Sequence, residues 1–188
     1  MIKITAFLAG LFLFACTTTQ AQNQKTTEPP SVAQTLNRSL SGVENEFVPA
    51  ADAMPGDKYS FAPTGGEFKG VRNFSEQLKH VAAVNYLVAA AILQEKPPVE
   101  LGGESGPASI KTKAEILQFL KDSFAYAHKA VATINETNLL TPIKSPFGEG
   151  TTTRLSMATL IFGHCFDHYG QIVVYLRMNG IVPPASRH

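Results

Sequence analysis

Four stretches of the chain carry apolar residues at steps of three and four, the spacing that places them on one face of an α-helix. These stretches run over about residues 31–55, from Asn73 to a stop at Pro97, from Thr112 to Ile134, and from about Thr153 to Gly180. An amphipathic helix must bury its apolar face against another element. Because no alternating strand pattern lies between the four stretches, we expect an all-α fold, a four-helix bundle with long connections.

Residues at the ends of these stretches are typical of helix boundaries. Ser31-Val-Ala-Gln34 and Asn73-Phe-Ser-Glu76 match the capping box, in which two side chains bond each other's backbone, and Thr112-Lys-Ala-Glu115 opens the third stretch. Gly180, followed shortly by Pro183-Pro184, is a strong stop signal for the fourth. Pro49 lies inside the first stretch and is expected to kink or locally end that helix.

The connections at about residues 56–72, 95–111 and 135–152 are rich in glycine and proline and longer than antiparallel neighbours require. Connections of that length are uncommon in compact domains without a role, so we expect at least one to cross the bundle or cover a site. A chain of 188 residues can bury one sizeable core but not comfortably two. We therefore expect one domain over residues 31–188.

The first 21 residues have the pattern of a signal peptide for export. Lys3 supplies a positive start, an apolar run follows from Ile4 to Ala15, and Thr19-Gln20-Ala21 is a small-residue cleavage site. Residues 22–30 are polar and end in two prolines, which predicts a flexible linker. The mature protein is therefore expected to be periplasmic or secreted, without a transmembrane helix. A second interpretation takes Leu13-Phe14-Ala15-Cys16 as a lipoprotein box in which Cys16 is lipidated.

Cysteine and charge limit how the mature protein is stabilised and what it binds. Cleavage after Ala21 would remove Cys16 and leave Cys165 as the one remaining cysteine, so no intramolecular disulfide could form. The formal net charge is +1, from 16 basic and 15 acidic residues without a block of like charge. This distribution offers no electrostatic footprint for nucleic acid or for an anionic membrane. The expected partner is an unknown small-molecule substrate, which must be inferred from a site.

Two of the five histidines lie four residues apart in His164-Cys-Phe-Asp-His168, so both rings fall on one face of the fourth helix. They continue the apolar stripe of that helix, which contains Met157, Ile161, Ile172 and Tyr175. Both histidines are therefore expected to face the core. Two neighbouring imidazoles at this spacing can share a metal ion.

A third histidine, His80, lies on the second helix in step with the apolar residues Val84, Leu87 and Val88. It can point into the same interior, and ligands from facing helices at one level build the metal sites of helical bundles. The alternatives are histidines hydrogen-bonded within the core or a solvated pair at the end of the bundle. His128 has no partner in the sequence and is expected in a structural or surface role, and His188 is the last residue.

The segments around these three histidines resemble the DinB-like family of metal-dependent enzymes. The resemblance lies in Asn73-Phe-Ser-Glu-Gln-Leu-Lys-His80, in His164-Cys-Phe-Asp-His168-Tyr-Gly-Gln171 and in the tail Tyr175-Leu-Arg-Met-Asn-Gly-Ile-Val-Pro-Pro184. It runs from about Val32 to Pro184. It implies a four-helix bundle, a metal ion carried by His80, His164 and His168, and a homodimer.

The ligand set indicates which chemistry is available. Three neutral imidazoles would leave a divalent transition-metal ion its full charge and an open position, as in catalytic zinc sites. Such an ion lowers the pKa of water toward roughly 7, which favours a metal-dependent hydrolase. Zinc, nickel, iron and copper all accept imidazole, so the identity of the metal is left open. Some DinB-like relatives transfer small thiols, so a thiol S-transferase is an alternative, as is a non-catalytic module that binds metal or a partner in the cell envelope.

Residues beside the histidines receive supporting roles, and none is assigned as catalytic. Glu76 is expected to serve the capping box rather than to orient His80. Gln77 and Gln171 lie one turn from His80 and His168 and could hydrogen-bond a ligand or a water molecule. Helical phase places Asp167 on the flank of its helix. It also predicts that Cys165 is a small buried hydrophobe. Walls of a pocket are expected at Tyr169, Tyr175 and Pro146-Phe-Gly148.

Overall fold

The computed structural model describes residues 29–187. It contains four α-helices, α1 (Val32–Ala53), α2 (Phe74–Leu93), α3 (Lys113–Val131) and α4 (Arg154–Met178), two short 3-10 helices, Gly56–Lys58 and Pro184–Ser186, and two strands, β1 (Pro142–Lys144) and β2 (Thr151–Thr153). The predicted signal peptide, the lipoprotein box with Cys16, the linker up to residue 28 and His188 lie outside the described residues. Within residues 29–187, no helix combines the length and the apolar character needed to span a bilayer.

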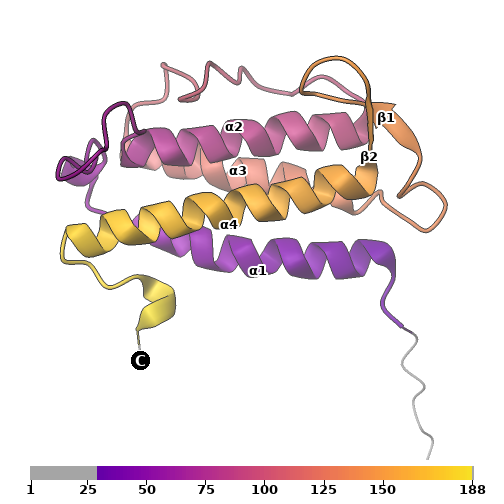
Figure 1. Ribbon diagram of the computed structural model, residues 1–188. Coiled ribbons are helices and arrows are strands. Elements are labelled where there is room, and N and C mark those ends of the chain that lie inside the picture. Colours follow the sequence, from indigo (N-terminus) through magenta and orange to yellow (C-terminus); the bar gives the residue numbers. More distant parts are fainter. Residues whose placement is uncertain (1–28, 188) are drawn as a thin grey trace, which may run out of the picture.

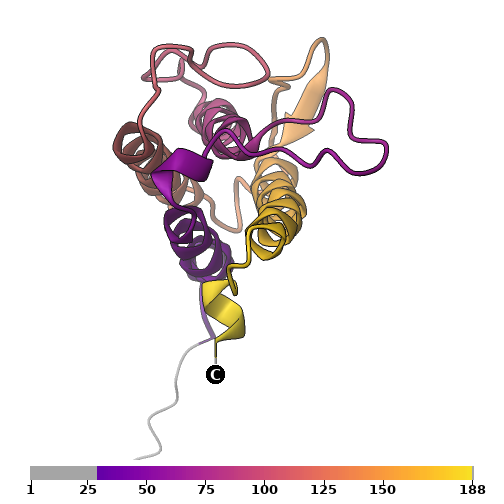
Figure 2. The ribbon, with the colours of Figure 1, turned by 90° about the vertical axis from the view of Figure 1, so that its left-hand side faces the viewer.

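The four α-helices lie side by side around a common apolar interior (Figure 1). Helix α2 packs against α3 and α4, and α1 packs against the same two helices from the opposite side. The end-on view in Figure 2 shows this four-cornered arrangement. Side chains with no solvent exposure come from all four helices and include Leu40, Phe47, Leu78, Val81, Leu120, Phe124, Ile161 and Ile172. The apolar stripes predicted from the sequence are thus the surfaces that meet.

The helix starts agree with the sequence analysis because their caps are local. Ser31, Asn73 and Thr112 each accept a hydrogen bond from the backbone three residues later, and the side chain at that later position bonds back to the cap residue. These reciprocal bonds satisfy backbone groups that the first helical turn leaves without partners. Thr153 caps α4 by accepting from the backbone of Ser156. Polar side chains at the caps therefore fix where each helix begins.

Three predicted helix ends need correction. Pro49 does not end α1, which continues to Ala53, because the side chains around the proline, Phe47, Ala50 and Ala51, are fully buried and hold the last turn in place. Helix α2 ends at Leu93, before the two prolines, where Gln94 adopts a left-handed conformation with φ 58°. Helix α3 ends at Val131, yet Ile134 is buried at 1 % exposure in the turn that follows.

The all-α prediction is also too narrow, because β1 and β2 form a small antiparallel sheet in the connection between α3 and α4. Pro142 pairs with Thr153, Ile143 with Thr152 and Lys144 with Thr151. Each strand has three residues, which is shorter than the four to eight that a visible alternation of apolar and polar residues needs. Ile143 packs inward at 3 % exposure and joins the sheet to the helical core.

The connection from α2 to α3 runs back along the outside of α2 (Figure 1). Its Glu104 carbonyl contacts His80 and its Pro107 carbonyl accepts from Lys79, both on the first half of α2. Lys113, at the start of α3, bonds the backbone carbonyls of Asp52 and Met54 at the end of α1. Of the two predicted roles for a long connection, crossing the bundle or covering a site, residues 95–111 take the second, because they run along α2 and contact His80.

Thr112→Ala should lower the free energy of unfolding by about 1 kcal/mol. The substitution removes the Oγ1 atom that accepts from the Glu115 backbone at 3.2 Å, and leaves that N–H without a partner at the start of α3. Urea denaturation followed by circular dichroism measures the change. Thr112→Ser keeps the hydroxyl and should stay close to the wild type; equal stability of the alanine and serine variants would show that the cap contributes nothing.

Candidate metal centre

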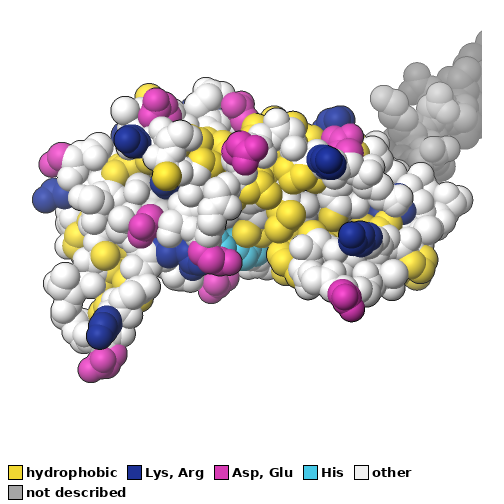
Figure 3. Space-filling model, turned by 90° about the horizontal axis from the view of Figure 1, so that it is seen from above, with side chains coloured by type: hydrophobic (Ala, Val, Ile, Leu, Met, Phe, Trp, Pro, Cys, Tyr) yellow, Lys and Arg dark blue, Asp and Glu magenta, His cyan; other side chains and the backbone are white. Residues whose placement is uncertain are grey.

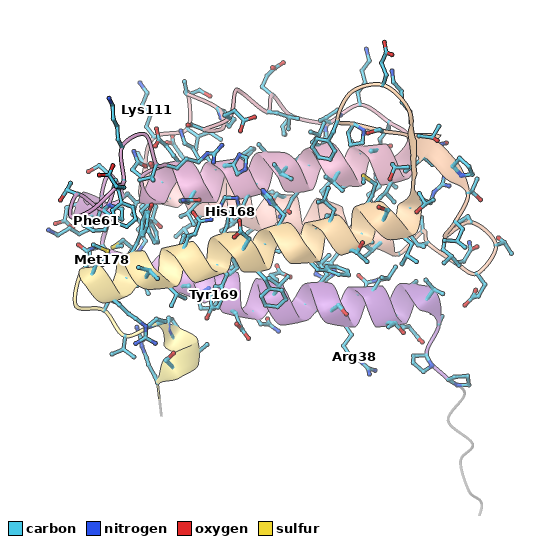
Figure 4. All side chains as sticks on the ribbon, in the orientation of Figure 1. Arg38, Phe61, Lys111, His168, Tyr169 and Met178 are labelled. Atoms are coloured by element: carbon cyan, nitrogen blue, oxygen red, sulfur yellow. The ribbon has the colours of Figure 1, made fainter. Side chains whose placement is uncertain are left out.

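The rings of His80, His164 and His168 meet between α2 and α4. Their centroids lie 5.0 Å (His80 to His164), 4.9 Å (His80 to His168) and 4.5 Å (His164 to His168) apart. One ring nitrogen from each lies within 4.8 Å of the others, so the three histidines could hold a metal ion. Figure 4 shows His168 in this space between the two helices. The structure therefore brings together the three residues predicted from the sequence.

His80 is oriented by the backbone of the connection that runs along α2. Its Nδ1 donates to the carbonyl oxygen of Glu104 at 2.8 Å. A carbonyl only accepts, so the proton is on Nδ1 and Nε2 keeps its lone pair. The connection is held close to α2 by Gly106, whose φ is 72° and where a Cβ would lie 2.5 Å from the Cβ of Lys79. A residue with a side chain would push the Glu104 carbonyl away from His80.

His168 is oriented by a chain of two amides that ends at a carboxylate. Its Nδ1 lies 2.5 Å from Oε1 of Gln77, Nε2 of Gln77 donates to Oε1 of Gln171 at 2.8 Å, and Nε2 of Gln171 donates to Oδ2 of Asp167 at 3.2 Å. An ionised carboxylate only accepts, which orients both amides in turn and places the proton of His168 on Nδ1. Gln77 and Gln171 therefore bond a histidine and each other.

His164 lacks the hydrogen-bonded support that the other two rings have, and its Nε2 faces a ring nitrogen of His80 in a way that fits a cation. Its Nε2 faces Nε2 of His80 at 3.1 Å, and its Nδ1 is buried without a hydrogen-bond partner. Because Nε2 of His80 carries a lone pair, either a proton or a positive ion must separate the two facing nitrogens. Buried polar atoms without partners are rare in folded proteins. A metal ion among the three rings would use the lone pairs that converge there.

Burial keeps all three imidazoles neutral at pH 7. Desolvation, together with the neighbouring rings of His168 and His80, lowers the pKa of His164 to about 3. Desolvation and the charge of His80 lower the pKa of His168 to about 4. Desolvation and the Arg72 guanidinium lower the pKa of His80 as well. Metal ligation by histidine requires the neutral ring, so the environment favours the form that binds a cation.

Arg72 and Glu104 lie beside His80 and were not singled out from the sequence. The Arg72 guanidinium donates to the Glu104 carboxylate at 2.7 Å and to its backbone carbonyl at 3.0 Å. The Glu104 carboxylate lies 3.9 Å from Nδ1 of His80, and its side chain is 86 % exposed. Neither residue has a spacing relative to the histidines that sequence periodicity could detect. The glycines on either side of Glu104 were the available signal that this segment makes a close turn.

Three supporting residues behave as predicted. Glu76 accepts from the Asn73 backbone at 2.8 Å and completes the capping box of α2. Asp167 is exposed on the flank of α4 and bonds Gln171 rather than reaching the three rings. Cys165 is fully buried, its thiol lies 3.4 Å from Oδ1 of Asn85, and burial raises its pKa to about 12. A thiol in that state is neither a ligand nor a nucleophile at neutral pH.

A cavity of about 660 Å³ opens beside the histidines, and its walls test the pocket predictions. Phe147, in the loop between β1 and β2, lines it as expected. The two tyrosines do not. Tyr169 lies on the side of α4 toward α1, where it packs against Phe47 (Figure 4), and Tyr175 packs against Phe61 while its hydroxyl donates to the Arg72 carbonyl. Helical phase failed here because it gives the direction of a side chain but not the element that covers it.

His128 has the structural role expected of it. Its Nδ1 lies 2.7 Å from Oδ1 of Asn37 and its Nε2 lies 3.0 Å from the Glu44 carboxylate, so it joins α3 to α1. Neither of these two contacts involves the three-histidine group.

Comparisons with known proteins agree with this arrangement. A sequence profile described as the DinB superfamily matches residues 39–172. The crystal structure of a DinB-like protein from Bacillus cereus ATCC 10987 superimposes with a TM-score of 0.61 at 14 % sequence identity, and the match covers 79 % of this chain and 93 % of that chain. At this identity the structural match shows a shared fold. No functionally curated protein sequence matches the chain.

The metal-free protein should lose stability as the pH falls from about 6.5 toward 4. The unfolded chain takes up protons on His164 and His168 near pH 6.5, whereas the folded protein keeps these rings neutral until their lowered pKa values are reached, so protons favour unfolding in this window. Urea denaturation between pH 7.5 and 4.5 measures the effect. The double variant His164→Asn/His168→Asn should show a shallower dependence, and equal slopes for both proteins would contradict the assignment of the lowered pKa values.

Proposed function

The chain belongs to the DinB superfamily, and we propose that it is a metal-dependent hydrolase in which His80, His164 and His168 hold one divalent transition-metal ion. The observation that carries the proposal is the convergence of three neutral imidazoles, two of which bring their Nε2 atoms face to face at 3.1 Å. Two of the rings also line a cavity of about 660 Å³. A ligand set that opens onto a cavity is typical of catalytic sites, because structural metal sites are closed by a fourth protein ligand.

The hydrogen bonds around the rings suit this role. The Glu104 carbonyl and the Gln77 amide hold the Nδ1 protons of His80 and His168, so each ring presents Nε2 as the ligand atom. Acceptors of this kind fix the tautomer and the orientation of metal-binding histidines. Zinc, nickel, iron and copper all suit a set of three imidazoles, and zinc, nickel and iron are the ions we propose here. When bound, the ion supplies a Lewis acid that polarises a carbonyl group and lowers the pKa of a water molecule.

Hydrolysis also needs a group that moves a proton, and we assign this step to Glu104. Among the described residues that line the cavity, Glu104 alone carries a carboxylate. Its exposed side chain reaches within 3.9 Å of His80, and Arg72 holds it at the mouth of the cavity. The carboxylate lies on the Nδ1 side of the His80 ring, away from the Nε2 that would hold the ion, so it would exchange a proton with the attacking water through an intervening water molecule and return that proton to the leaving group.

Three expectations from the sequence stay predictions, namely export, the homodimer and the limits of the 31–188 domain. They rest on the N-terminal pattern and on the family resemblance, and the described residues do not test them. The thiol S-transferase and the non-catalytic binding module are outcomes that the experiment below distinguishes from hydrolysis.

The purified protein, loaded with zinc, nickel or iron, should bind about one ion per chain and hydrolyse the activated ester p-nitrophenyl acetate. His164→Ala and His168→Ala should each abolish stoichiometric binding and reduce hydrolysis to the rate of the metal-free protein, because two imidazoles cannot replace the three-ligand set. Elemental mass spectrometry measures the metal, absorbance at the nitrophenolate band measures hydrolysis, and circular dichroism checks that helicity is kept.

His128→Ala is the matched control, since His128 bonds Asn37 and Glu44 and should leave both readings unchanged. Full metal retention in both His164→Ala and His168→Ala would contradict the assignment of these residues as ligands. A loaded protein that transfers a small thiol to an electrophile but hydrolyses nothing would establish the transferase instead. Metal binding without either reaction would establish a binding module.

Gln77→Leu should weaken metal affinity about tenfold to a hundredfold. The leucine fills a similar space at a position that is 2 % exposed, but it removes the acceptor that holds the Nδ1 proton of His168. Competition with a chromophoric chelator measures the dissociation constant. Gln77→Glu restores an acceptor for Nδ1 and should bind the ion at least as tightly as the wild type. Equal affinity of the leucine variant and the wild type would show that the amide chain does not act on the site.

A further inference from the structure

The cavity beside the histidines is formed by α2, α4, the connection that runs along α2 and the loop between β1 and β2. Its lining residues are His80, Ala83, Val84, Leu87, Leu101, Gly102, Gly103, Glu104, Phe147, Leu160 and His164. Seen from above, histidine is visible at this surface with apolar side chains next to it (Figure 3). The cavity therefore joins the three-histidine group to solvent through an apolar passage.

The two rings that line the cavity are those of His80 and His164, the pair whose Nε2 atoms face each other at 3.1 Å. A molecule that reacts at the histidine group from this side must place its remaining part against the apolar walls. Leu160 is 36 % exposed and Phe147 is 54 % exposed, so the walls keep apolar surface in contact with water. Covering that surface with an apolar ligand group is favourable, because it removes apolar area from water.

The charges around the cavity are unsuited to an anionic tail. Its one described carboxylate, Glu104, is already paired with Arg72 at 2.7 Å, and no lysine or arginine is among its lining residues. Leu87 also lines a neighbouring cavity of about 850 Å³, whose walls include Glu95, Lys96 and Lys144. The apolar lining therefore extends from the histidines to about Leu87, and charged groups begin beyond it.

We propose that this cavity binds the apolar acyl group of the substrate, so that the protein acts on esters or amides of uncharged aliphatic acids. This inference rests on the proposed function, because it places the scissile carbonyl at His80 and His164. Leu87, Leu101, Leu160 and Phe147 set the specificity by contact with the acyl chain. Esters or amides whose acyl group carries a further carboxylate are poor substrates, since the apolar walls offer that charge no partner.

Aliphatic hydroxamates test the proposal through binding rather than through turnover. A hydroxamate group chelates a divalent ion, and its alkyl chain then occupies the space available to an acyl group. Acetohydroxamate, butanohydroxamate and hexanohydroxamate are titrated into the zinc-loaded protein by isothermal calorimetry. The dissociation constant should fall about fourfold for each added methylene that is buried. Succinic monohydroxamate, whose chain ends in a carboxylate, should bind no tighter than acetohydroxamate.

Leu160→Asn and Val174→Asn form a matched pair on α4, because both side chains are exposed and only Leu160 lines the cavity. Leu160→Asn should weaken hexanohydroxamate binding by about fivefold or more, while acetohydroxamate binding stays at the wild-type value. Val174→Asn should leave both unchanged. Unchanged acetohydroxamate binding also shows that the variant is folded and holds its metal.

The outcomes separate this inference from the proposal on which it rests. Binding of all three alkyl hydroxamates with equal affinity would overturn the acyl-binding cavity while the metal site stands. If the zinc-loaded protein bound none of the hydroxamates, the ion would not be accessible from the cavity. That result would overturn the inference as well. A protein that holds no zinc, nickel or iron would remove the metal-dependent hydrolase itself, which the metal analysis detects before any hydroxamate is added.

Discussion

The site depends on the approach of two ring nitrogens, Nε2 of His80 and Nε2 of His164, across the contact between α2 and α4. Each ring lies on the apolar stripe of its helix, so packing the helices brings both into a region from which most water is excluded. Desolvation lowers the pKa of both, and the rings stay neutral when they meet. Neutral rings with converging lone pairs attract a cation, and this follows directly from burying histidine on two facing helices.

The path of one long connection couples the fold to the site. Helix α3 begins beside the end of α1, where Lys113 bonds the Asp52 and Met54 carbonyls, so residues 95–111 must return along α2 to reach it. On this path the chain places the Glu104 carbonyl on His80 and forms one wall of the cavity with Leu101. The same segment thus satisfies the topology, orients a candidate ligand and shapes the space in front of it.

Much of the fold follows from the sequence because helix formation and capping are local. The reciprocal bonds at Ser31, Asn73 and Thr112 need only four consecutive residues, and the apolar steps of three and four need only one helix. Errors arose where distant contacts decide the outcome. Burial around Pro49 keeps α1 intact past the proline, and β1 and β2 exist because two three-residue segments pair with each other.

The sequence by itself determined that His80, His164 and His168 share the interior, because the phase of a helix fixes which residues lie on its buried side. Only the tertiary structure decided what surrounds them. The amide chain from Gln77 through Gln171 to Asp167 joins two helices, and the Glu104 carbonyl and the Arg72 guanidinium arrive on connections without periodicity. Such contacts depend on the route of the chain between helices, which is set by packing far from the residues concerned and leaves no regular spacing in the sequence.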